Sequence, residues 1–289
     1  MTSSYANAHR LFLQASMSER FFTETKAIEM YKKAYLANNV RRPTETFQEF
    51  IASINQKLNT IDMEIRKSHD ETDGTPVWAL VNTNGDEISK LVTEYTAVEI
   101  SYFKHLIELI VTADYEEFSV SSITALREAS KLKTSITKSA AESLLQKFVE
   151  DKWLILSKNG KYSLSQRAIL ELQVYLKETY EDNLIECTLC YDIITKGQRC
   201  DVQQCKSRFH HHCSRNYFAS QTEKVCPSCK IAWKESNVIG EDNNNKSKGG
   251  SSRRKNKRAT AVTREGDEEE EEEEEIEEVV AEEEDERDY

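Results

Sequence analysis

Seven cysteines and one histidine, all between residues 187 and 229, are the residues of this chain best suited to chemistry. They occur in the order Cys187-x2-Cys190-x9-Cys200-x4-Cys205-x4-His210-x2-Cys213-x12-Cys226-x2-Cys229. Thiolate and imidazole groups bind zinc, and a two-residue gap lets one tight turn direct two side chains at the same ion. Two tetrahedral sites need eight ligands, so this spacing predicts two Zn²⁺ ions.

The alternative is that these cysteines are free core residues or form disulfides. Seven is an odd number, so disulfide pairing would leave one thiol over. The first ten residues carry no apolar secretory signal, which favours a reducing compartment. A segment of about 45 residues also has too little core to fold alone, and metal ions would supply much of its folding free energy.

The imidazole ligand has three candidates, because His210, His211 and His212 are consecutive. His210 precedes Cys213 by a two-residue gap, as in the other close pairs, whereas His211 and His212 are too near to Cys213 for that turn. The spacing favours His210.

The order of the eight ligands resembles the cross-braced RING and PHD zinc fingers, in which alternate pairs share a metal. That resemblance implies one zinc site from Cys187, Cys190, His210 and Cys213, and a second from Cys200, Cys205, Cys226 and Cys229. The Cys-Pro-Ser-Cys turn favours RING, and Lys224 stands where PHD fingers usually have an aromatic residue. Cys205 replaces the usual RING histidine, so the segment resembles a variant RING.

A RING implies recruitment of a ubiquitin-conjugating enzyme, with no nucleophile of its own. Leu189 and Pro227 match the apolar positions that RINGs present to that enzyme, and Lys230 follows the last ligand, where an activating basic residue is common. Ordinary packing within the two turns explains Leu189 and Pro227 equally well. The sequence shows no Ser-His-Asp set and no glycine-rich phosphate loop that would indicate another active site.

The remaining chain must position this segment, and its composition favours helices. With 289 residues it has room for about two domains and a smaller one, and 8 Gly and 3 Pro are few for an all-β chain. No apolar run approaches the roughly 18 residues of a membrane helix, so we expect no membrane contact. The net charge of −12 comes almost entirely from residues 241–289, which hold 9 Lys or Arg and 20 Asp or Glu.

Residues 1–95 show the order of a winged-helix domain. The apolar spacing over 10–36 predicts two helices broken near 16–18. Thr46-x-x-Glu49 is a capping box that opens a third helix, with an apolar stripe continuing to Ile61 and Ile65. An extended segment over 75–80, a polar turn over 82–86 and residues 88–95 would then form the hairpin.

Residues 96–182 repeat that order. Capping boxes at Thr96-x-x-Glu99 and Ser139-x-x-Glu142 open two helices, with a short helix over 122–129 between them. The Asn159-Gly160 turn predicts a hairpin of 153–156 with 162–164, and a closing helix runs over 166–180. The sequence therefore predicts a mainly α fold with small β hairpins: tandem winged-helix domains, then the two-zinc variant RING (183–236) and a disordered charged tail (237–289).

The second winged helix is a candidate DNA-binding surface, with Lys147, Lys152, Lys158 and Lys161 as its basic residues. The same helix carries Glu142, Glu150 and Asp151, whereas a DNA-binding face is normally a coherent basic patch. We therefore favour protein contact for this face.

Several short runs in order resemble the non-SMC element one family: 9–14, 81–83, 88–91, 99–104, 160–165 and the variant zinc segment. The resemblance spans 5–233. It implies a nuclear, chromatin-associated ubiquitin ligase subunit of the Smc five-six chromosome-maintenance complex, acting in DNA repair. The implied partners are a MAGE-like winged-helix subunit, the kleisin subunit and a ubiquitin-conjugating enzyme, with DNA reached through the complex.

The tail after residue 233 lies outside that resemblance. The basic stretch over 246–264 has the composition of a nuclear-import signal or a nucleic-acid contact, and a solvated linker explains it equally well. The acidic run that follows is interpreted as a solubilising tail.

Two other functions stay open beside the ligase. One is a structural subunit whose zinc domain only docks partners. The other is a chromatin or DNA reader that uses the zinc domain or the second winged helix.

Overall fold

The computed structural model describes residues 6–41, 43, 45–84, 94–132 and 136–240. Within these ranges the chain is mainly helical with three small antiparallel sheets. The charged tail predicted over 237–289 lies outside the described residues from 241 onward. No helix of the described ranges is long and apolar enough to cross a membrane.

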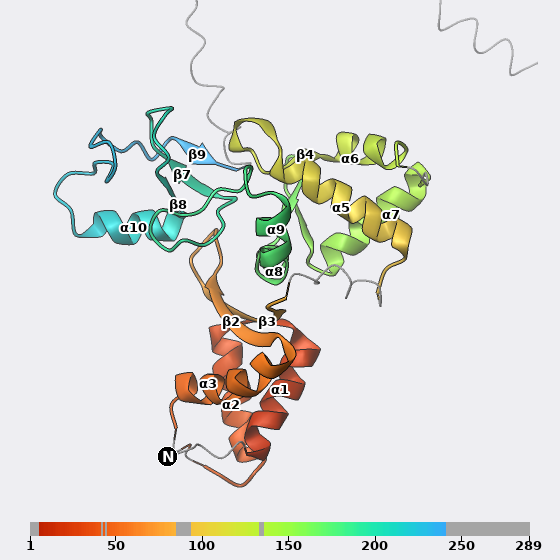
Figure 1. Ribbon diagram of the computed structural model, residues 1–289, viewed down its shortest axis with the longest axis vertical. Helices are drawn as coiled ribbons and strands as arrows, with labels where there is room; N and C mark the ends of the chain where they lie inside the picture. Colours follow the sequence, from red (N-terminus) through yellow and green to blue (C-terminus); the bar gives the residue numbers. More distant parts are fainter. Residues whose placement is uncertain (1–5, 42, 44, 85–93, 133–135, 241–289) are drawn as a thin grey trace, which may run out of the picture. The chain divides into compact units, whose positions relative to one another are not determined.

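The first helical unit packs three helices against one small sheet (Figure 1). Its elements are α1 (Asn7–Glu19), β1 (Phe21–Thr23), α2 (Glu24–Leu36), α3 (Phe47–Leu58), the 3-10 turn η1 (Asn59–Ile61), β2 (Met63–His69) and β3 (Pro76–Asn82). The strand order is β1-β3-β2. Phe12, Phe50 and Ile54 are fully buried at its centre, where the Phe12 and Phe50 rings meet edge to face at 5.3 Å.

The hairpin of this unit lies earlier than the sequence predicted. Helix α3 begins at the predicted cap Thr46 but ends at Leu58, and Asp62 adopts a left-handed conformation that turns the chain into β2. The predicted apolar stripe therefore divides: Ile61 is 65% exposed, whereas Ile65 is buried from strand β2. The hairpin pairs β2 with β3 around residues 70–75. Most of the predicted partner strand, residues 88–95, lies outside the described residues.

The predicted helix break near residues 16–18 was also wrong. Helix α1 continues to Glu19, and the buried Ser16 hydroxyl is satisfied within it by a 2.9 Å hydrogen bond to the carbonyl of Phe12 one turn earlier. The break comes at Arg20, whose φ of +55° ends the helix before β1.

The second helical unit repeats the order helix, strand, helix, helix, strand, strand. Its elements are α5 (Ala97–Val111), η3 (Asp114–Glu116), β4 (Val120–Ser121), α6 (Ser122–Ala129), α7 (Lys138–Glu150), β5 (Leu154–Leu156), β6 (Lys161–Leu164), α8 (Gln166–Glu171) and α9 (Gln173–Thr179). The sheet order β4-β6-β5 has the same pattern as in the first unit. The predicted α5 cap, α6 and the β5–β6 hairpin are confirmed. The N-cap of helix α7 is Thr137, two residues before the predicted cap Ser139, and the closing helix divides at Leu172.

The tight turn between β5 and β6 depends on Gly160, whose φ is +72°. We predict that Gly160→Ala lowers the free energy of unfolding by about 1 kcal/mol, because a side chain disfavours this backbone conformation. Steric crowding adds little, since a Cβ there would meet only the Ser122 hydroxyl at 3.6 Å. Chemical denaturation of the full chain measures the change, with exposed Lys158→Ala in the same turn as control; equal midpoints for the two variants would contradict this prediction.

The zinc segment follows α9. It contains β7 (Gly197–Arg199), β8 (Arg208–Phe209), α10 (His211–Ala219) and β9 (Val238–Ile239), in a sheet of order β8-β7-β9. Beside the cysteines, its core consists of Phe209, Phe218 and Trp233, and the Phe209 and Trp233 rings stack at 4.7 Å. Strand β9 lies beyond residue 236, where the sequence prediction ended the zinc domain and began a disordered tail. Residues 238–239 instead pair with β7 in the sheet.

Candidate metal centres

The structure brings the eight predicted ligands together in two groups of four. Cys187, Cys190, His210 and Cys213 form the first group, here called site one, and Cys200, Cys205, Cys226 and Cys229 form the second, here called site two. Within each group all ligand atoms lie within 4.8 Å of one another. The first and third pairs along the chain share site one, and the second and fourth pairs share site two. The two groups are thus interleaved along the chain.

Two of the pairs sit on turns with the same backbone geometry. The amide of Tyr191 donates to the carbonyl of Cys187, and the amide of Lys230 donates to the carbonyl of Cys226, both at 2.9 Å. Tyr191 and Lys230 both have a positive φ, of +62° and +64°. These two turns are here called the knuckles; each directs two sulfur atoms towards one point and exposes the residue that follows.

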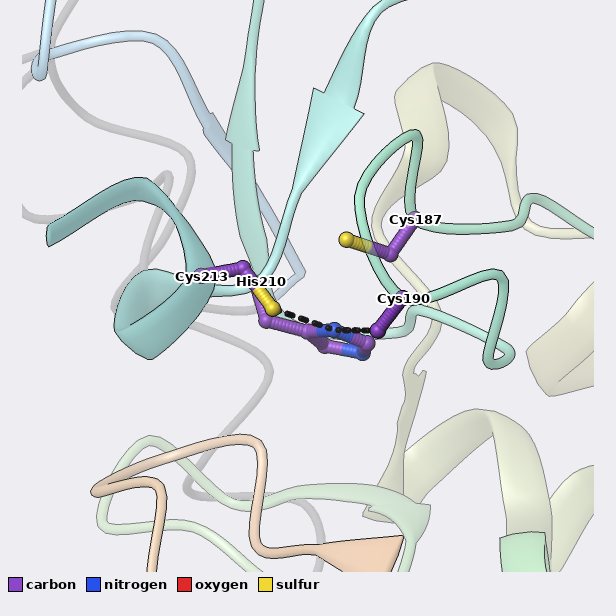
Figure 2. A group of neighbouring side chains, drawn as sticks. All are labelled: Cys187, Cys190, His210 and Cys213. Carbon is purple, nitrogen blue, oxygen red and sulfur yellow. Dashed lines mark hydrogen bonds between the residues drawn. The ribbon is translucent and has the colours of Figure 1, made fainter. Parts of the chain in front are cut away.

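The other two pairs come from the sheet and from α10. Cys200 directly follows β7, and Cys205 lies in the loop before β8. His210 is the N-cap of α10 and Cys213 lies in its first turn, so the start of the helix presents both to site one (Figure 2). The seven cysteines form no disulfide.

The distances between ligand atoms fit zinc. Tetrahedral zinc with Zn–S bonds of about 2.3 Å and Zn–N bonds of about 2.0 Å holds its ligand atoms roughly 3.5–3.8 Å apart. In site one, Nδ1 of His210 lies 3.3 Å from Sγ of Cys190 and 3.9 Å from Sγ of Cys213. In site two, the sulfurs of Cys200 and Cys229 are 3.4 Å apart, and those of Cys205 and Cys226 are 3.7 Å apart. The two clusters are therefore consistent with two zinc ions.

The three consecutive histidines have different surroundings. His210 is 3% exposed; its Nδ1 faces the sulfurs and its Nε2 lies 3.1 Å from the carbonyl oxygen of Ile193. His212 lies outside the four-residue group, although its Nε2 is 3.3 Å from Sγ of Cys213. Burial lowers the pKa of His212 below the usual value of a histidine. His211 begins α10 and is not part of either group.

The predicted contact residues for a conjugating enzyme lie on the knuckles. Leu189 is half-buried against the zinc-segment core, and Pro227 is half-buried at the second knuckle. Lys230 is exposed, and its Nζ donates to the carbonyl oxygen of Pro227 at 2.8 Å. The sequence analysis missed two exposed apolar residues nearby, Tyr191 and Ile231, at 71% and 48% exposure. Their position next to each knuckle was the available signal.

Two lysines of the candidate DNA-binding face contact other residues of the chain. Lys161 forms an ion pair with Glu117, and Lys147 donates to the carbonyl oxygen of Glu94 and lies 4.2 Å from the centre of the Tyr95 ring. The ion pair offsets the charge of Lys161, and the contacts of Lys147 hold its ammonium group against the chain, so both lysines are less available to phosphate groups.

Comparison with known proteins agrees with this architecture. A family model described as "Nse1 non-SMC component of SMC5-6 complex" matches residues 9–172, more than half of the chain. This chain belongs to the Nse1 family. The resemblance stated from the sequence is thereby confirmed, and a second model, described as "RING-like domain", matches residues 187–229.

Several curated relatives support the Nse1 assignment. The bovine "Non-structural maintenance of chromosomes element 1 homolog" is 35% identical over 232 residues, covering 80% of this chain and 86% of the relative. The human homolog is 36% identical over 228 residues, covering 78% and 84%. The fission yeast protein, from Schizosaccharomyces pombe, is 27% identical and covers 81% and 95%.

A solved structure shows the same fold. One chain of a structure titled "Nse1-Nse3-Nse4 complex" superposes with a TM-score of 0.70 at 31% identity, covering 80% of this chain and 98% of that chain. The Nse1 family is thus supported by sequence and by three-dimensional structure.

Proposed function

We propose that this chain is a RING-type ubiquitin ligase subunit of the SMC5-6 complex. The observation that carries the proposal is the interleaving of site one and site two, with knuckles of matching backbone geometry at Cys187 and Cys226. All eight residues are proposed as zinc ligands, four at each site. When bound, the two zinc ions hold the knuckles in place; they take no part in ubiquitin transfer.

The knuckles provide a surface for a ubiquitin-conjugating enzyme. Leu189 and Pro227 supply half-buried apolar contacts, Tyr191 and Ile231 add exposed apolar area, and Lys230 supplies a positive charge. Fixing the orientation of the conjugating enzyme that carries ubiquitin accelerates attack on its thioester without a nucleophile from this chain. Exposed apolar side chains surrounded by a polar rim are typical of a docking site.

The domain organisation and partners form part of the proposal. Both helical units have the element order of a winged helix, with the same sheet order, which supports tandem winged-helix domains over 1–95 and 96–182. The structural relative belongs to an assembly with Nse3 and Nse4, so we propose a MAGE-like and a kleisin partner for this chain. The proposal includes a role in DNA repair on nuclear chromatin, which membership of the Nse1 family supports.

The test is ubiquitin transfer by the full chain purified with its Nse3 and Nse4 partners. We expect Leu189→Ala combined with Pro227→Ala to reduce transfer roughly 10-fold or more, because a few contact residues carry most of the binding energy of an interface. The zinc content should stay at two per chain, since neither residue is a proposed ligand.

A matched control replaces two exposed apolar residues of the helical units, Leu36→Ala with Ile123→Ala, at 57% and 78% exposure. This control should transfer ubiquitin as the unmodified chain does. Equal transfer by the knuckle variant and the control would refute the proposed contact surface. No transfer by the unmodified complex with any conjugating enzyme would instead make the zinc segment a docking module.

A further inference from the structure

A buried carboxylate from the first helical unit lies against site one. Glu71 is in the turn between β2 and β3 and is only 4% exposed. Its Oε1 accepts a 2.6 Å hydrogen bond from the amide of Thr195, and its Oε2 accepts one of 2.6 Å from the Thr195 hydroxyl. Its Oε1 also lies 3.4 Å from Nε2 of His210. Burying a carboxylate is costly unless donors compensate it, and here the compensating donors lie in the zinc segment.

His210 is oriented by its two ring nitrogens. Nδ1 faces the sulfurs of site one, while Nε2 faces Glu71 and the carbonyl oxygen of Ile193. A histidine bound to a metal normally donates its other ring N–H to a carboxylate or carbonyl, which fixes the ring and increases its basicity as a ligand. The carbonyl oxygen of Ile193, at 3.1 Å, and Oε1 of Glu71, at 3.4 Å, share this outer position beside Nε2.

The whole β2–β3 turn packs closely on the start of α10. Gly74 has a φ of +82°, and a Cβ on it would lie 2.5 Å from Cβ of His212. The guanidinium of Arg215 donates to the carbonyl oxygen of Asp73 at 3.1 Å, and the His69 and His212 rings are 5.3 Å apart. The turn therefore packs at a defined position beside site one. Figure 1 shows the β2–β3 hairpin extending towards the zinc segment.

We propose that Glu71 is a positioning residue for site one, which couples metal binding there to docking of the β2–β3 turn. The proposal rests on the assignment of His210 as a zinc ligand. Glu71 holds the His210 ring with Nδ1 towards the metal and, through Thr195, fixes the loop that follows the first knuckle. By thermodynamic linkage, metal at site one must then stabilise the docked turn to the same extent that the docked turn stabilises the metal.

Site two provides an internal control, because the hydrogen bonds and the ion pair of the Glu71 carboxylate go to Thr195, Lys196 and His210, none of which is a ligand of that site. The experiment loads the full chain with two equivalents of Co²⁺ or Zn²⁺ and measures release from each site under a competing chelator. Absorption bands of the three-sulfur, one-nitrogen site and of the four-sulfur site distinguish the two for Co²⁺. We expect Glu71→Gln and Glu71→Ala to weaken site one by about 10- to 100-fold and to leave site two unchanged.

The variants are chosen to separate positioning from general destabilisation. Glu71→Gln preserves the side-chain volume, so it tests the carboxylate even if Glu71→Ala folds poorly. Arg215→Ala removes an exposed contact of the same turn without touching His210, and it should leave the affinity of site one within about 2-fold. Equal weakening of both sites by Glu71→Gln, or an unchanged site one, overturns the proposal.

Hydrogen exchange measures how metal at site one affects the docked β2–β3 turn. We expect loss of metal from site one, through Cys190→Ser, to accelerate exchange of amides in residues 70–75, and Glu71→Gln to do the same with both metals bound. Unchanged protection of this turn in Cys190→Ser would overturn the coupling. An unmodified chain that binds fewer than two zinc ions would overturn the ligand assignment itself, whereas loss of ubiquitin transfer alone bears only on the proposed ligase function.

Discussion

Replacing Cys226 by Ser is expected to unfold β7, β8 and α10 while both helical units stay folded. Cys226 is fully buried, and its sulfur lies 3.7 Å from that of Cys205 in site two. A structural zinc site contributes an apparent binding free energy of about 10–16 kcal/mol at neutral pH. The three large apolar side chains of the zinc-segment core, Phe209, Phe218 and Trp233, cannot replace a contribution of that size.

The helical units should survive because their cores are apolar. The second unit buries a large apolar cluster that includes Phe103, Leu106 and Phe148, and none of these three is a proposed ligand. Hydrogen exchange of the full chain measures the result: amides over 197–219 should lose protection, and those over 97–111 and 138–150 should keep it. Removal of zinc from the unmodified chain by a chelator should give the same pattern.

Ser236→Ala is the matched control, because Ser236 is an exposed residue of the same segment. It should retain two zinc ions and full protection. Retained protection of β7 and β8 in Cys226→Ser would contradict a structural role for site two.

The sequence predicted the parts of this fold whose determinants are local. The caps at Thr46 and Thr96, the Asn159-Gly160 turn and the two-residue gaps between ligands each act within a few residues, and the structure has each of them. The β2–β3 hairpin was missed for a physical reason. Ile65 continues the spacing of a helical stripe, yet the left-handed turn at Asp62 places it on a strand that buries the same side chain.

The surroundings of the metal sites depend on contacts between distant parts of the chain. Glu71 stands in a polar turn, Asp70-Glu71-Thr72-Asp73, where nothing local distinguishes it from its neighbours. Only folding brings it to Thr195 and His210. Periodicity and spacing describe one element at a time, and so they identify ligands but not the residues that orient them.

Glu116→Ala is expected to lower the local free energy of opening of β7 and β8, beside site two, by about 3 kcal/mol. Glu116 accepts hydrogen bonds from Nε and Nη2 of Arg208, at 2.9 and 2.6 Å, and the two side chains are only 20% and 10% exposed. Arg208 in turn donates to the carbonyl oxygen of the proposed ligand Cys205 at 2.7 Å. Removing one member of a largely buried pair leaves the other charge uncompensated, which is strongly destabilising.

The comparison that isolates this effect is an exposed ion pair in the same segment. Lys224 and Glu235 are 53% and 60% exposed, so Lys224→Ala should change stability by no more than about 0.5 kcal/mol. Hydrogen exchange of the β7 and β8 amides under native conditions reports the local free energy for both variants, with two zinc ions bound. Equal protection in Glu116→Ala and Lys224→Ala would show that the stability of β7 and β8 does not depend on the ion pair between Arg208 and Glu116. A larger loss in Glu116→Ala would mean that this ion pair, as well as zinc, holds the site-two loop on the second helical unit.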